Sequence, residues 1–505
     1  MRWKVPVSWG LALPAVCLPV FLEEAALSYG LQLLCLVLLA VLNRDIFVKG
    51  FRSLAKGRPG RDSMTAVSVS VLVMILQFAP ACAILAVESL GKWILHASGA
   101  GEDEAELTTA EETASRVASG TAFAVMGGAL IAGIVRAAAG ADVYHAAAAG
   151  VVFCMAIFPE SAVTALSEPI AKAVEGSEKL GVKIRNREVL RQAWALDEVV
   201  LDKRGTITEG MPEITDIIPI EGYFNLHMAG GLESRSAHPL GRAIREAALE
   251  RPGRLEEFEN LREYPGRGVS GERKGRRYLA GNETFMEEMG VKPDYREGRR
   301  LLKEGKTVVY FAASETIVGI IALRDGPRAT GLRAVRMIES MGIDVTMLTG
   351  DSRITADAIC REVGIDRAIA QIVPGEKQRI ISELRKGGRR KVAMVGDQVR
   401  DRAAIESADT SFVLGGGPEW ADSQVDVILE SSDLCDVART VRLSRTTVLR
   451  GRENLVIAAA FAAAGLAAAV CCFCLETSFV IPVAGSAAFA YLAPVCEKLN
   501  SRRNK

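Results

Sequence analysis

Long apolar stretches occupy both ends of this 505-residue chain, and a long segment of mixed polarity separates them. The apolar residues concentrate in residues 5–42, 64–95, 117–165 and 455–492. Runs of about 20 apolar residues are long enough to cross a bilayer as helices. Residues 172–452 have instead the composition of a soluble α/β protein. The pattern predicts a multi-pass membrane protein with one large cytosolic insertion.

Within the insertion, three short apolar runs each end in polar residues suited to phosphate chemistry. These are Val199-Val200-Leu201 before Asp202-Lys203-Arg204-Gly205-Thr206-Ile207-Thr208, Val345-Thr346-Met347-Leu348 before Thr349-Gly350-Asp351, and Val392-Ala393-Met394-Val395 before Gly396-Asp397. Three such strands suit a parallel sheet whose carboxyl edge carries the chemistry. Lys377, in Pro374-Gly375-Glu376-Lys377, adds a cation between the second and third strands, and Asp401 follows the third.

This set of motifs resembles the phosphorylation domain of P-type ATPases, in the haloacid-dehalogenase superfamily. The resemblance implies that Asp202 is a nucleophile that takes the γ-phosphoryl group of ATP as an aspartyl-phosphate. It also implies that Thr349 and Lys377 hold the phosphoryl group, and that Asp397 holds Mg²⁺ beside Asp202. Lys203, Thr206 and Asp401 complete the predicted catalytic set. The alternative is an ordinary α/β sheet with acidic strand ends.

A second group of motifs lies between the first and second of these strands. It consists of Glu233, Ser236-Ala237-His238-Pro239-Leu240, Gly266-Arg267-Gly268-Val269-Ser270-Gly271 and Gly281-Asn282. In this order the motifs are similar to the nucleotide-binding domain of heavy-metal-translocating P-type ATPases. The similarity implies that Glu233 and His238 orient the adenosine of ATP and that the glycines let the backbone approach it. The predicted nucleotide contacts are Glu233, His238, Gly266, Gly268, Gly281, Asn282, Gly350 and Asp351. A helix cap followed by a hairpin is the alternative, because turns use the same glycines.

The predicted fold is therefore a multi-pass α-helical membrane domain with two cytosolic domains. One is a Rossmann-like phosphorylation domain of the haloacid-dehalogenase type, and the other is an inserted α+β nucleotide-binding domain. The predicted boundaries are transmembrane helices 1–4 in 1–97, a short linker in 98–116, helices 5–6 in 117–170, the phosphorylation domain in 171–208 and 323–436, the nucleotide-binding domain in 209–322, and helices 7–8 with a basic tail in 437–505.

Eight membrane spans are expected. Residues 5–22, 25–42, 117–135, 143–158, 455–474 and 479–495 each suit one helix, whereas 64–95 is long for one and short for two. Two tight helices turning near Pro80 are predicted, because a single span would place the phosphorylation domain outside the cell, away from ATP. The basic residues of 44–61 then lie inside, as the positive-inside rule requires. The chain is expected in the cell membrane with its catalytic domains in the cytoplasm. No small-residue cleavage site follows Leu22, so a retained anchor is predicted.

Composition excludes two further classes. Lysine plus arginine balance aspartate plus glutamate at 61 each, so nothing in the net charge favours nucleic acid. Most of the ten cysteines sit in apolar segments, which is not a disulfide framework. Cys471, Cys472 and Cys474 could bind a soft metal ion, but they diverge around a helical turn, and thiols are common in apolar helices.

The chain departs from the family in the actuator domain. The family inserts about a hundred residues carrying Thr-Gly-Glu at the place where this chain has only residues 96–116, and no cytosolic segment here contains Thr-Gly-Glu. That glutamate positions the water that hydrolyses the aspartyl-phosphate, which is a general-base task. A phosphorylated Asp202 should turn over slowly unless a separate actuator-like protein supplies the group.

The metal path differs as well. The family's transport helix carries Cys-Pro-Cys, whose thiolates bind soft metal ions; this chain has Phe158-Pro159-Glu160 in register. Pro159 should still break the helix and free carbonyls at membrane depth. Glu160 suits a hard ion or a proton, or is a carboxylate hydrated or paired inside the bundle. Phe461-Ala462 replaces a family Tyr-Asn pair, so the path argues against copper, and the cation, if any, stays unidentified.

Two arginines replace smaller family residues near the phosphoryl site. Arg204 stands where the family has threonine, and Arg400 where it has asparagine. Two guanidinium groups there would bind phosphate oxygens and disfavour a nearby Mg²⁺. In the alternative, both side chains point to solvent and the Arg204 carbonyl still serves Mg²⁺.

Three functions compete. The first is an ATP-driven P-type pump that forms an aspartyl-phosphate at Asp202 with ATP and Mg²⁺. The second is a non-transporting relative that senses ATP or phosphate. The third is a membrane-tethered phosphohydrolase, which Arg204 disfavours because such enzymes carry an acid at that position. We expect ATP binding and autophosphorylation with slow turnover.

Overall fold

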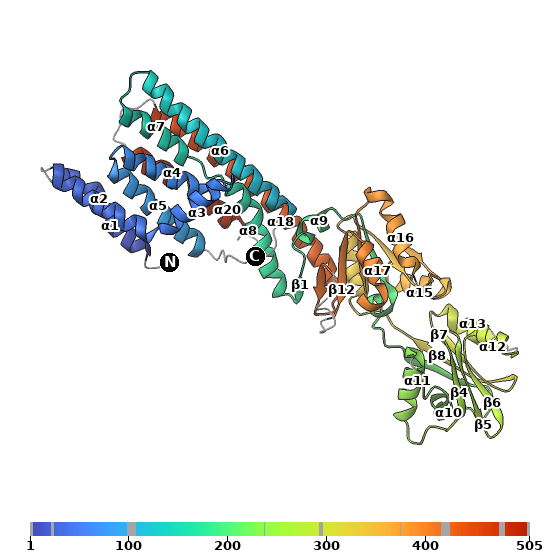
Figure 1. Cartoon of the computed structure of the whole chain (residues 1–505). Helices are drawn as coiled ribbons and strands as arrows, with labels where there is room; N and C mark the ends of the chain where they lie inside the picture. Colours follow the sequence, from blue (N-terminus) through green and yellow to red (C-terminus); the bar gives the residue numbers. More distant parts are fainter. Residues whose placement is uncertain are drawn as a thin grey trace. The chain divides into compact units, whose positions relative to one another are not determined.

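The computed structural model describes residues 4–21, 25–97, 108–236, 238–291, 296–373, 375–415, 425–473 and 480–501. Its contacts divide the chain into two compact units (Figure 1). The membrane unit contains residues 1–176 and 443–505, and the cytosolic unit contains residues 177–442. The helices α8 and α18 run through the two places where the chain passes from one unit to the other.

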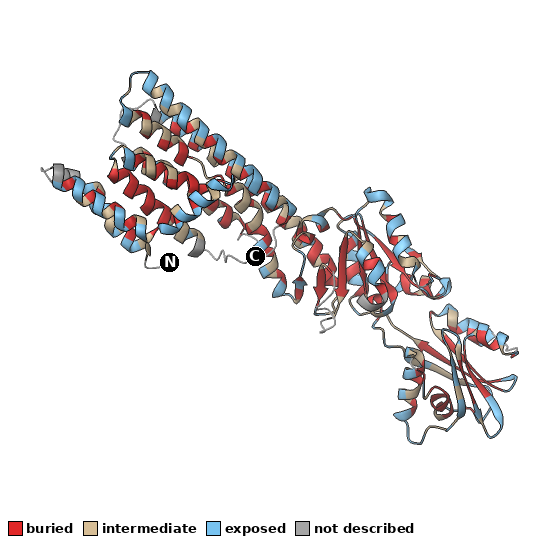
Figure 2. Cartoon of the chain, viewed as in Figure 1, coloured by how far each residue is buried: buried red, intermediate tan, exposed pale blue. Residues whose placement is uncertain are grey.

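The membrane unit is entirely helical where it is described. Its helices are α1 (Lys4–Phe21), α2 (Ala25–Leu42), α3 (Arg44–Ala55), α4 (Arg61–Met74), α5 (Phe78–Ala97), α6 (Thr109–Ala138), α7 (Val143–Met155), α8 (Ser161–Glu178), α18 (Cys435–Phe473), α19 (Val480–Ala490) and α20 (Leu492–Ser501). Side chains of α1 to α5, α7, α18 and α19 form one apolar core around Leu39, Leu72 and Leu85. Figure 2 shows α4 and α5 largely buried and much of α6 exposed.

Three described helices are long and apolar enough to cross a membrane: Phe78–Leu95, Thr109–Ala138 and Cys435–Cys471. A fourth is added if α2 and α3, bent by 69° at Asn43, count as one span. The helices α1 and α7 are apolar but shorter. The count of eight spans therefore stays a prediction.

Residues 64–95 do form two helices, but the turn between them differs from the prediction. The helix α4 ends at Met74 and α5 begins at Phe78, so the chain turns at residues 75–77, where Leu76 has a φ of 59°. Pro80 lies in the first turn of α5, where its missing N–H has no helical partner to lose.

The helix α6 begins eight residues before the predicted span at 117. Thr108 and Glu111 form a reciprocal capping box at its N-terminus, which satisfies two backbone N–H groups. The end of the predicted linker is thus helical, while its residues 98–107 lie outside the described part of the chain.

The phosphorylation domain is built on a seven-stranded sheet in the order β1-β13-β12-β11-β2-β9-β10, parallel except for β1. The strands are β1 (Val182–Ile184), β2 (Glu198–Asp202), β9 (Asp344–Leu348), β10 (Arg367–Ile369), β11 (Val392–Gly396), β12 (Thr410–Leu414) and β13 (Val427–Leu429). The helices are α9 (Val189–Gln192), α14 (Gly331–Glu339), α15 (Arg353–Val363), α16 (Glu376–Leu384) and α17 (Gln398–Ser407). All five residues of β2 are buried, as expected of a central parallel strand covered on both faces.

The register of this sheet brings the three predicted motifs to one edge. Leu201 of β2 pairs with Val395 of β11 on one side and with Met347 of β9 on the other. Asp202 is therefore level with the ends of both neighbours, and residues 349–351 and 397 follow directly. The predicted Rossmann-like arrangement is confirmed.

The nucleotide-binding domain is a six-stranded antiparallel sheet in the order β3-β8-β7-β6-β5-β4. The strands are β3 (Glu213–Pro219), β4 (Glu259–Tyr264), β5 (Gly268–Arg273), β6 (Arg276–Gly281), β7 (Thr307–Ala313) and β8 (Thr316–Arg324), and the helices are α10 (Leu226–Leu232), α11 (Pro239–Leu249), α12 (Glu283–Glu288) and α13 (Arg296–Lys303). Side chains of β7 alternate between two cores: Val309 and Phe311 join the core of α10 and α11, and Val308 and Tyr310 join the core of α12 and α13. The sheet is thus covered on both faces, and the predicted α+β insertion is confirmed.

Candidate phosphoryl-transfer site

Asp202 ends β2 with only 4% of its surface exposed. The loop that follows it requires a glycine, because Gly205 has a φ of 77°, in the left-handed region. The returning segment after β8 holds this loop in place. The Arg328 guanidinium donates to the carbonyls of Gly205 and Thr206, at 3.0 Å each. Asp325 accepts from the Thr208 hydroxyl at 2.6 Å.

Lys377, from the first turn of α16, lies between the carboxylate of Asp202 at the end of β2 and that of Asp401 in α17. Its Nζ lies 2.6 Å from Asp202 Oδ1 and 2.5 Å from Asp401 Oδ1. Burial by itself would lower the pKa of Lys377, but Asp202 and Asp401 outweigh burial and raise it. The ammonium therefore stays charged beside the predicted nucleophile.

Asp401 serves the loop as well as the lysine. It is buried in the first turn of α17, and its Oδ2 accepts from the backbone N–H of Asp397 at 3.0 Å. A Cβ on Gly396 would lie 2.6 Å from the same Oδ2. Glycine at this position thus allows Asp401 to reach back under the loop and hold the backbone of Asp397.

The loop after β9 brings Asp351 to the same edge of the sheet. Its carboxylate accepts a hydrogen bond from Lys203, and its backbone N–H donates to the Thr349 hydroxyl at 3.1 Å. The structure thus brings together Asp202, Lys203, Thr349, Lys377 and Asp401 as predicted. Asp351, predicted as a nucleotide contact, is engaged with the phosphorylation loop through Lys203, and that role was missed from the sequence.

Of the two arginines predicted near the phosphoryl site, the structure describes the side chain of Arg204 and not that of Arg400. Arg204 is 44% exposed, and its Nη2 lies 3.5 Å from Asp351 Oδ1. Its side chain therefore leans toward the loop after β9. Arg400 lies in α17, but its side chain is outside the described residues. The idea that both guanidinium groups face the phosphoryl site stays a prediction.

Mg²⁺ binds hard oxygen ligands, so a site for it at the carboxyl edge of the seven-stranded sheet requires carboxylates there. Among the described residues, no group of three His, Cys, Asp or Glu could hold a metal ion by itself. Mg²⁺ is usually held by one or two carboxylates together with substrate phosphates and water. Asp202 and Asp397, which follow neighbouring parallel strands in register, fit that smaller set.

In the nucleotide-binding domain, Glu233 and His238 lie around the start of α11. Glu233 is buried, and burial raises its pKa to about 7, against a hydrogen bond from Ser236 that lowers it. His238 is half-buried and caps α11, accepting from the N–H of Leu240 at 3.3 Å, and burial lowers its pKa. Glu263 of β4 acts electrostatically on both side chains, a neighbour that the sequence did not single out.

The predicted nucleotide-binding glycines have structural reasons of their own. Gly268 and Gly281 are cross-strand partners on β5 and β6, and a Cβ on either would collide with the ring of Phe285. Gly266 has a φ of 73° in the turn before β5. Asn282 caps α12 by accepting from the N–H of Phe285 at 2.9 Å, and its amide donates to the Gly266 carbonyl. Both contacts match the alternative of a helix cap plus a hairpin.

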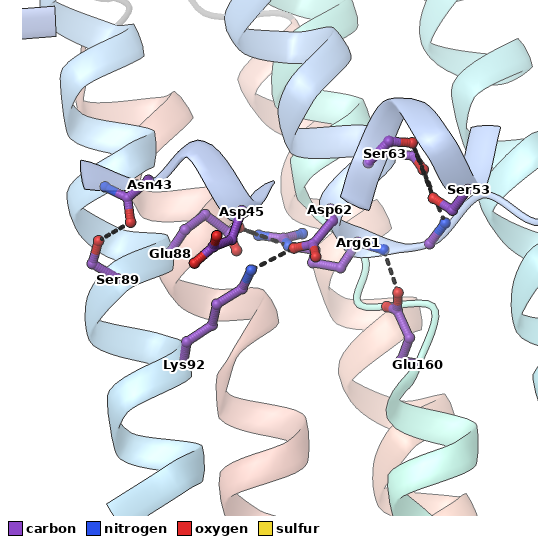
Figure 3. A network of polar contacts seen from close by, with 12 residues as sticks. Asn43, Asp45, Ser53, Arg61, Asp62, Ser63, Glu88, Ser89, Lys92 and Glu160 are labelled. Atoms are coloured by element: carbon purple, nitrogen blue, oxygen red, sulfur yellow. Dashed lines mark hydrogen bonds and ion pairs between the residues drawn. The ribbon is translucent and has the colours of Figure 1, made fainter. Parts of the chain in front are cut away.

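In the membrane unit, Pro159 lies in the break between α7 and α8, as predicted for a transport helix. Glu160 accepts a hydrogen bond from the backbone N–H of Arg61, while its Oε2 is buried with no hydrogen-bond partner among the described residues (Figure 3). Arg61 itself is buried beside Glu88. The sequence assigned Arg61 to a cytosolic basic loop; its position three residues before the apolar run that begins at Met64 was the available signal.

The chain resembles known proteins in sequence and in fold. Residues 197–409 match the family of haloacid dehalogenase-like hydrolases. The chain is 37% identical over 300 residues to the copper-exporting P-type ATPase B of Archaeoglobus fulgidus, covering 59% of this chain and 43% of that protein. It is 35% identical over 331 residues to a silver exporting P-type ATPase of Salmonella typhimurium, covering 64% and 40%. The chain thus spans about two fifths of the length of these relatives.

The fold comparison extends over the whole chain. The crystal structure of a zinc-transporting PIB-type ATPase in the E2.Pi state aligns with a TM-score of 0.67 and 19% sequence identity, covering 99% of both chains. At this sequence identity the likeness shows a shared fold and nothing about function. This chain thus contains a haloacid dehalogenase-like domain, is similar in sequence to heavy-metal P-type ATPases over about three fifths of its length, and shares the fold of the zinc-transporting neighbour.

Proposed function

We propose that this protein is a P-type ATPase-like membrane enzyme that binds ATP with Mg²⁺ and phosphorylates itself on Asp202. The observation that supports this proposal is the position of the Lys377 ammonium, between the carboxylates of Asp202 and Asp401. An aspartate at the end of a buried strand is a nucleophile if a nearby cation compensates the charge of the incoming phosphate. The enzyme would lie in the cell membrane with these domains in the cytoplasm.

The reaction follows from these positions. An Asp202 carboxylate oxygen attacks the γ-phosphorus of ATP, an acyl phosphate bond forms, and the bond from that phosphorus to the ADP oxygen breaks. Lys377, which stays protonated, compensates the negative charge of the phosphoryl oxygens, and Thr349 offers a hydroxyl at the neighbouring strand end. Mg²⁺ held by Asp202 and Asp397 would neutralise further phosphate charge. Arg204 would add a guanidinium from the loop.

Phosphorylation can be tested on the full chain in detergent with γ-labelled ATP. We expect acid-stable, hydroxylamine-sensitive label in the wild type and none in Asp202→Asn. Asp366→Asn, which changes an exposed carboxylate of the same domain, is the matched control and should keep the label. An unlabelled wild type, or label that persists in Asp202→Asn, would overturn the proposal.

Cation transport is the open part of this function. The relatives above are named as copper and silver exporters, and the structural neighbour as a zinc transporter. Here the path contains Pro159 and Glu160 in place of thiolates, which would suit an oxygen-binding cation or a proton. A role without transport, as a membrane-bound ATP or phosphate sensor, is the second candidate, and the surroundings of Arg61 favour it. A separate actuator-like protein would be the natural partner in either case.

A further inference from the structure

Arg61 lies inside the membrane unit, although it is the first residue of α4. Only 3% of its side chain is exposed, and none of the side chain of its partner Glu88 on α5. Arg61 Nε and Nη2 both lie 2.8 Å from Glu88 Oε1. The hydroxyl of Tyr491 donates to the other oxygen of Glu88 at 2.5 Å. Removing a guanidinium from water costs several kcal/mol, so these partners are needed to keep it charged.

The same guanidinium donates hydrogen bonds to the backbone carbonyls at the helix break. Its Nη1 donates to the carbonyls of Met155 and Ile157, at 3.0 Å each. The helical structure is interrupted between α7 and α8. The carbonyl of Met155 is therefore at the end of a helix, and that of Ile157 is outside it. Nη2 also lies 3.5 Å from the carbonyl of Ala487 in α19. Backbone carbonyls far apart in the sequence thus converge on one cation.

Aromatic rings close the remaining sides. The guanidinium carbon lies 5.7 Å from the centre of the Phe158 ring and 5.5 Å from that of Tyr491. Rings at this distance attract a cation and keep water away. The backbone N–H of Arg61 donates to Glu160, the last residue of the break before α8 (Figure 3).

We infer that the Arg61 guanidinium is the resident cation of the membrane path and takes the place of a transported metal ion. In broken transmembrane helices, freed carbonyls and buried carboxylates are the groups that coordinate ions. Here the carbonyls of Met155 and Ile157 and the carboxylate of Glu88 are already bonded to a side chain of the chain itself. With Arg61 in place, no group of three His, Cys, Asp or Glu side chains among the described residues is left to hold a metal ion.

Without Arg61, the same donors would be open to a different cation. The uncovered donors are carbonyl and carboxylate oxygens, with no thiolate among them, and oxygen donors suit hard divalent ions. A variant that lacks the guanidinium should therefore gain a site for Mn²⁺ and none for Cu(I). This expectation does not depend on phosphorylation of Asp202.

Mn²⁺ binding to the full chain in lipid nanodiscs tests the inference. All variants carry Asp397→Asn, so that the phosphorylation site contributes equally little. We expect no Mn²⁺ bound to the membrane unit with Arg61 in place, measured by the electron paramagnetic resonance of free Mn²⁺. Arg61→Ala should bind about one Mn²⁺ per chain, and adding Glu88→Gln and Glu160→Gln should abolish that binding.

Two results would contradict the inference, and a second variant covers the case in which Arg61→Ala does not fold. Mn²⁺ or Cu(I) bound with Arg61 present, and lost on Glu160→Gln, would overturn it. So would a folded Arg61→Ala that binds no Mn²⁺. If Arg61→Ala does not fold, Arg61→Met, which fills more of the space and leaves Glu88 and Glu160 in place, is judged by the same two criteria. A failure of autophosphorylation would leave all these results unaffected.

Discussion

Lys377 and Glu233 both have a raised pKa, for opposite physical reasons. Carboxylates raise the pKa of the lysine against its burial, so its charge is stabilised. Burial raises the pKa of the glutamate to about 7, so its charge is disfavoured. The lysine can therefore act as a permanent cation beside Asp202, while the glutamate changes protonation near neutral pH.

Replacing Lys377 with methionine should reduce the rate of Asp202 phosphorylation by about 10²–10³-fold, the usual effect of removing one charge-stabilising donor. Lys377→Arg should retain part of the rate because it keeps the charge. Phosphorylation by labelled ATP, measured in single turnovers, gives the rates. Lys386→Met changes an exposed lysine of the same domain and should leave them unchanged. A Lys377→Met protein that phosphorylates at the wild-type rate would show that the lysine does not face the phosphoryl group.

Glu233 should make the nucleotide-binding domain less stable as pH rises. Its folded pKa of about 7 lies above the ordinary value of 4.5, so the folded state binds more protons between these values. The stabilising contribution, about 3 kcal/mol at most, is complete below pH 4.5 and is lost as pH rises through 7. Hydrogen exchange of α10 in the full chain, corrected for intrinsic rates, should show this loss between pH 5 and 8. Glu233→Gln should remove the dependence, and a wild-type protection that rises with pH would contradict it.

Among the elements, the pair β5 and β6 is the clearest case of packing that demands glycine. A Cβ on Gly268 would lie 2.3 Å from the carbonyl oxygen of Ala280 and 2.6 Å from the Phe285 ring. Backbone on one side and a buried ring on the other leave little room to adjust. The two glycines thus allow α12 to pack against the hairpin, whether or not a nucleotide lies beside them.

Gly268→Ala should therefore destabilise the nucleotide-binding domain by about 1–3 kcal/mol, as overpacked sites do. Faster hydrogen exchange in β5, β6 and α12 without ATP would report the loss. The matched control is Gly222→Ala in the same domain, because a Cβ there meets nothing within 4 Å. Unchanged exchange combined with weaker ATP binding would instead show that Gly268 acts only on the nucleotide.

At the scale of the whole molecule, two helices connect the cytosolic unit to the membrane unit. The helices α8 and α18 each continue from one unit into the other without a break in their secondary structure. A continuous helix is a rigid element through which a change at one end can reach the other. In this protein the carbonyls at the break between α7 and α8 accept hydrogen bonds from Arg61. The sequence contains no Thr-Gly-Glu.

The phosphorylated protein should consequently be long-lived. Loss of a positioned general base slows a reaction by about 10²–10⁴-fold. After a chase with unlabelled ATP, the label on Asp202 should decay more slowly by about that factor than in a family member that carries Thr-Gly-Glu. Hydroxylamine added at the end should still release the label, which controls for its chemical nature. Decay as fast as in the comparison protein would mean that another group of this chain activates water.

The sequence by itself determined the local parts of this protein. The apolar run that ends in Asp202 and the position of Pro159 within an apolar stretch are features of neighbouring residues, and each predicted its local structure correctly. Hydrophobic periodicity and proline act over a few residues, so a reader of the sequence has all the information required.

Only the tertiary structure decided which charges meet. Asp351 lies 148 positions after Lys203, and Arg61 lies 99 positions before Glu160, so no local pattern links either pair. A buried charge is stable only when its partner is brought in by the fold, and the partner can come from any element. The sequence could therefore name the carboxylate at the helix break, whereas the cation that already occupies it became visible only once α4, α5, α7 and α19 were packed together.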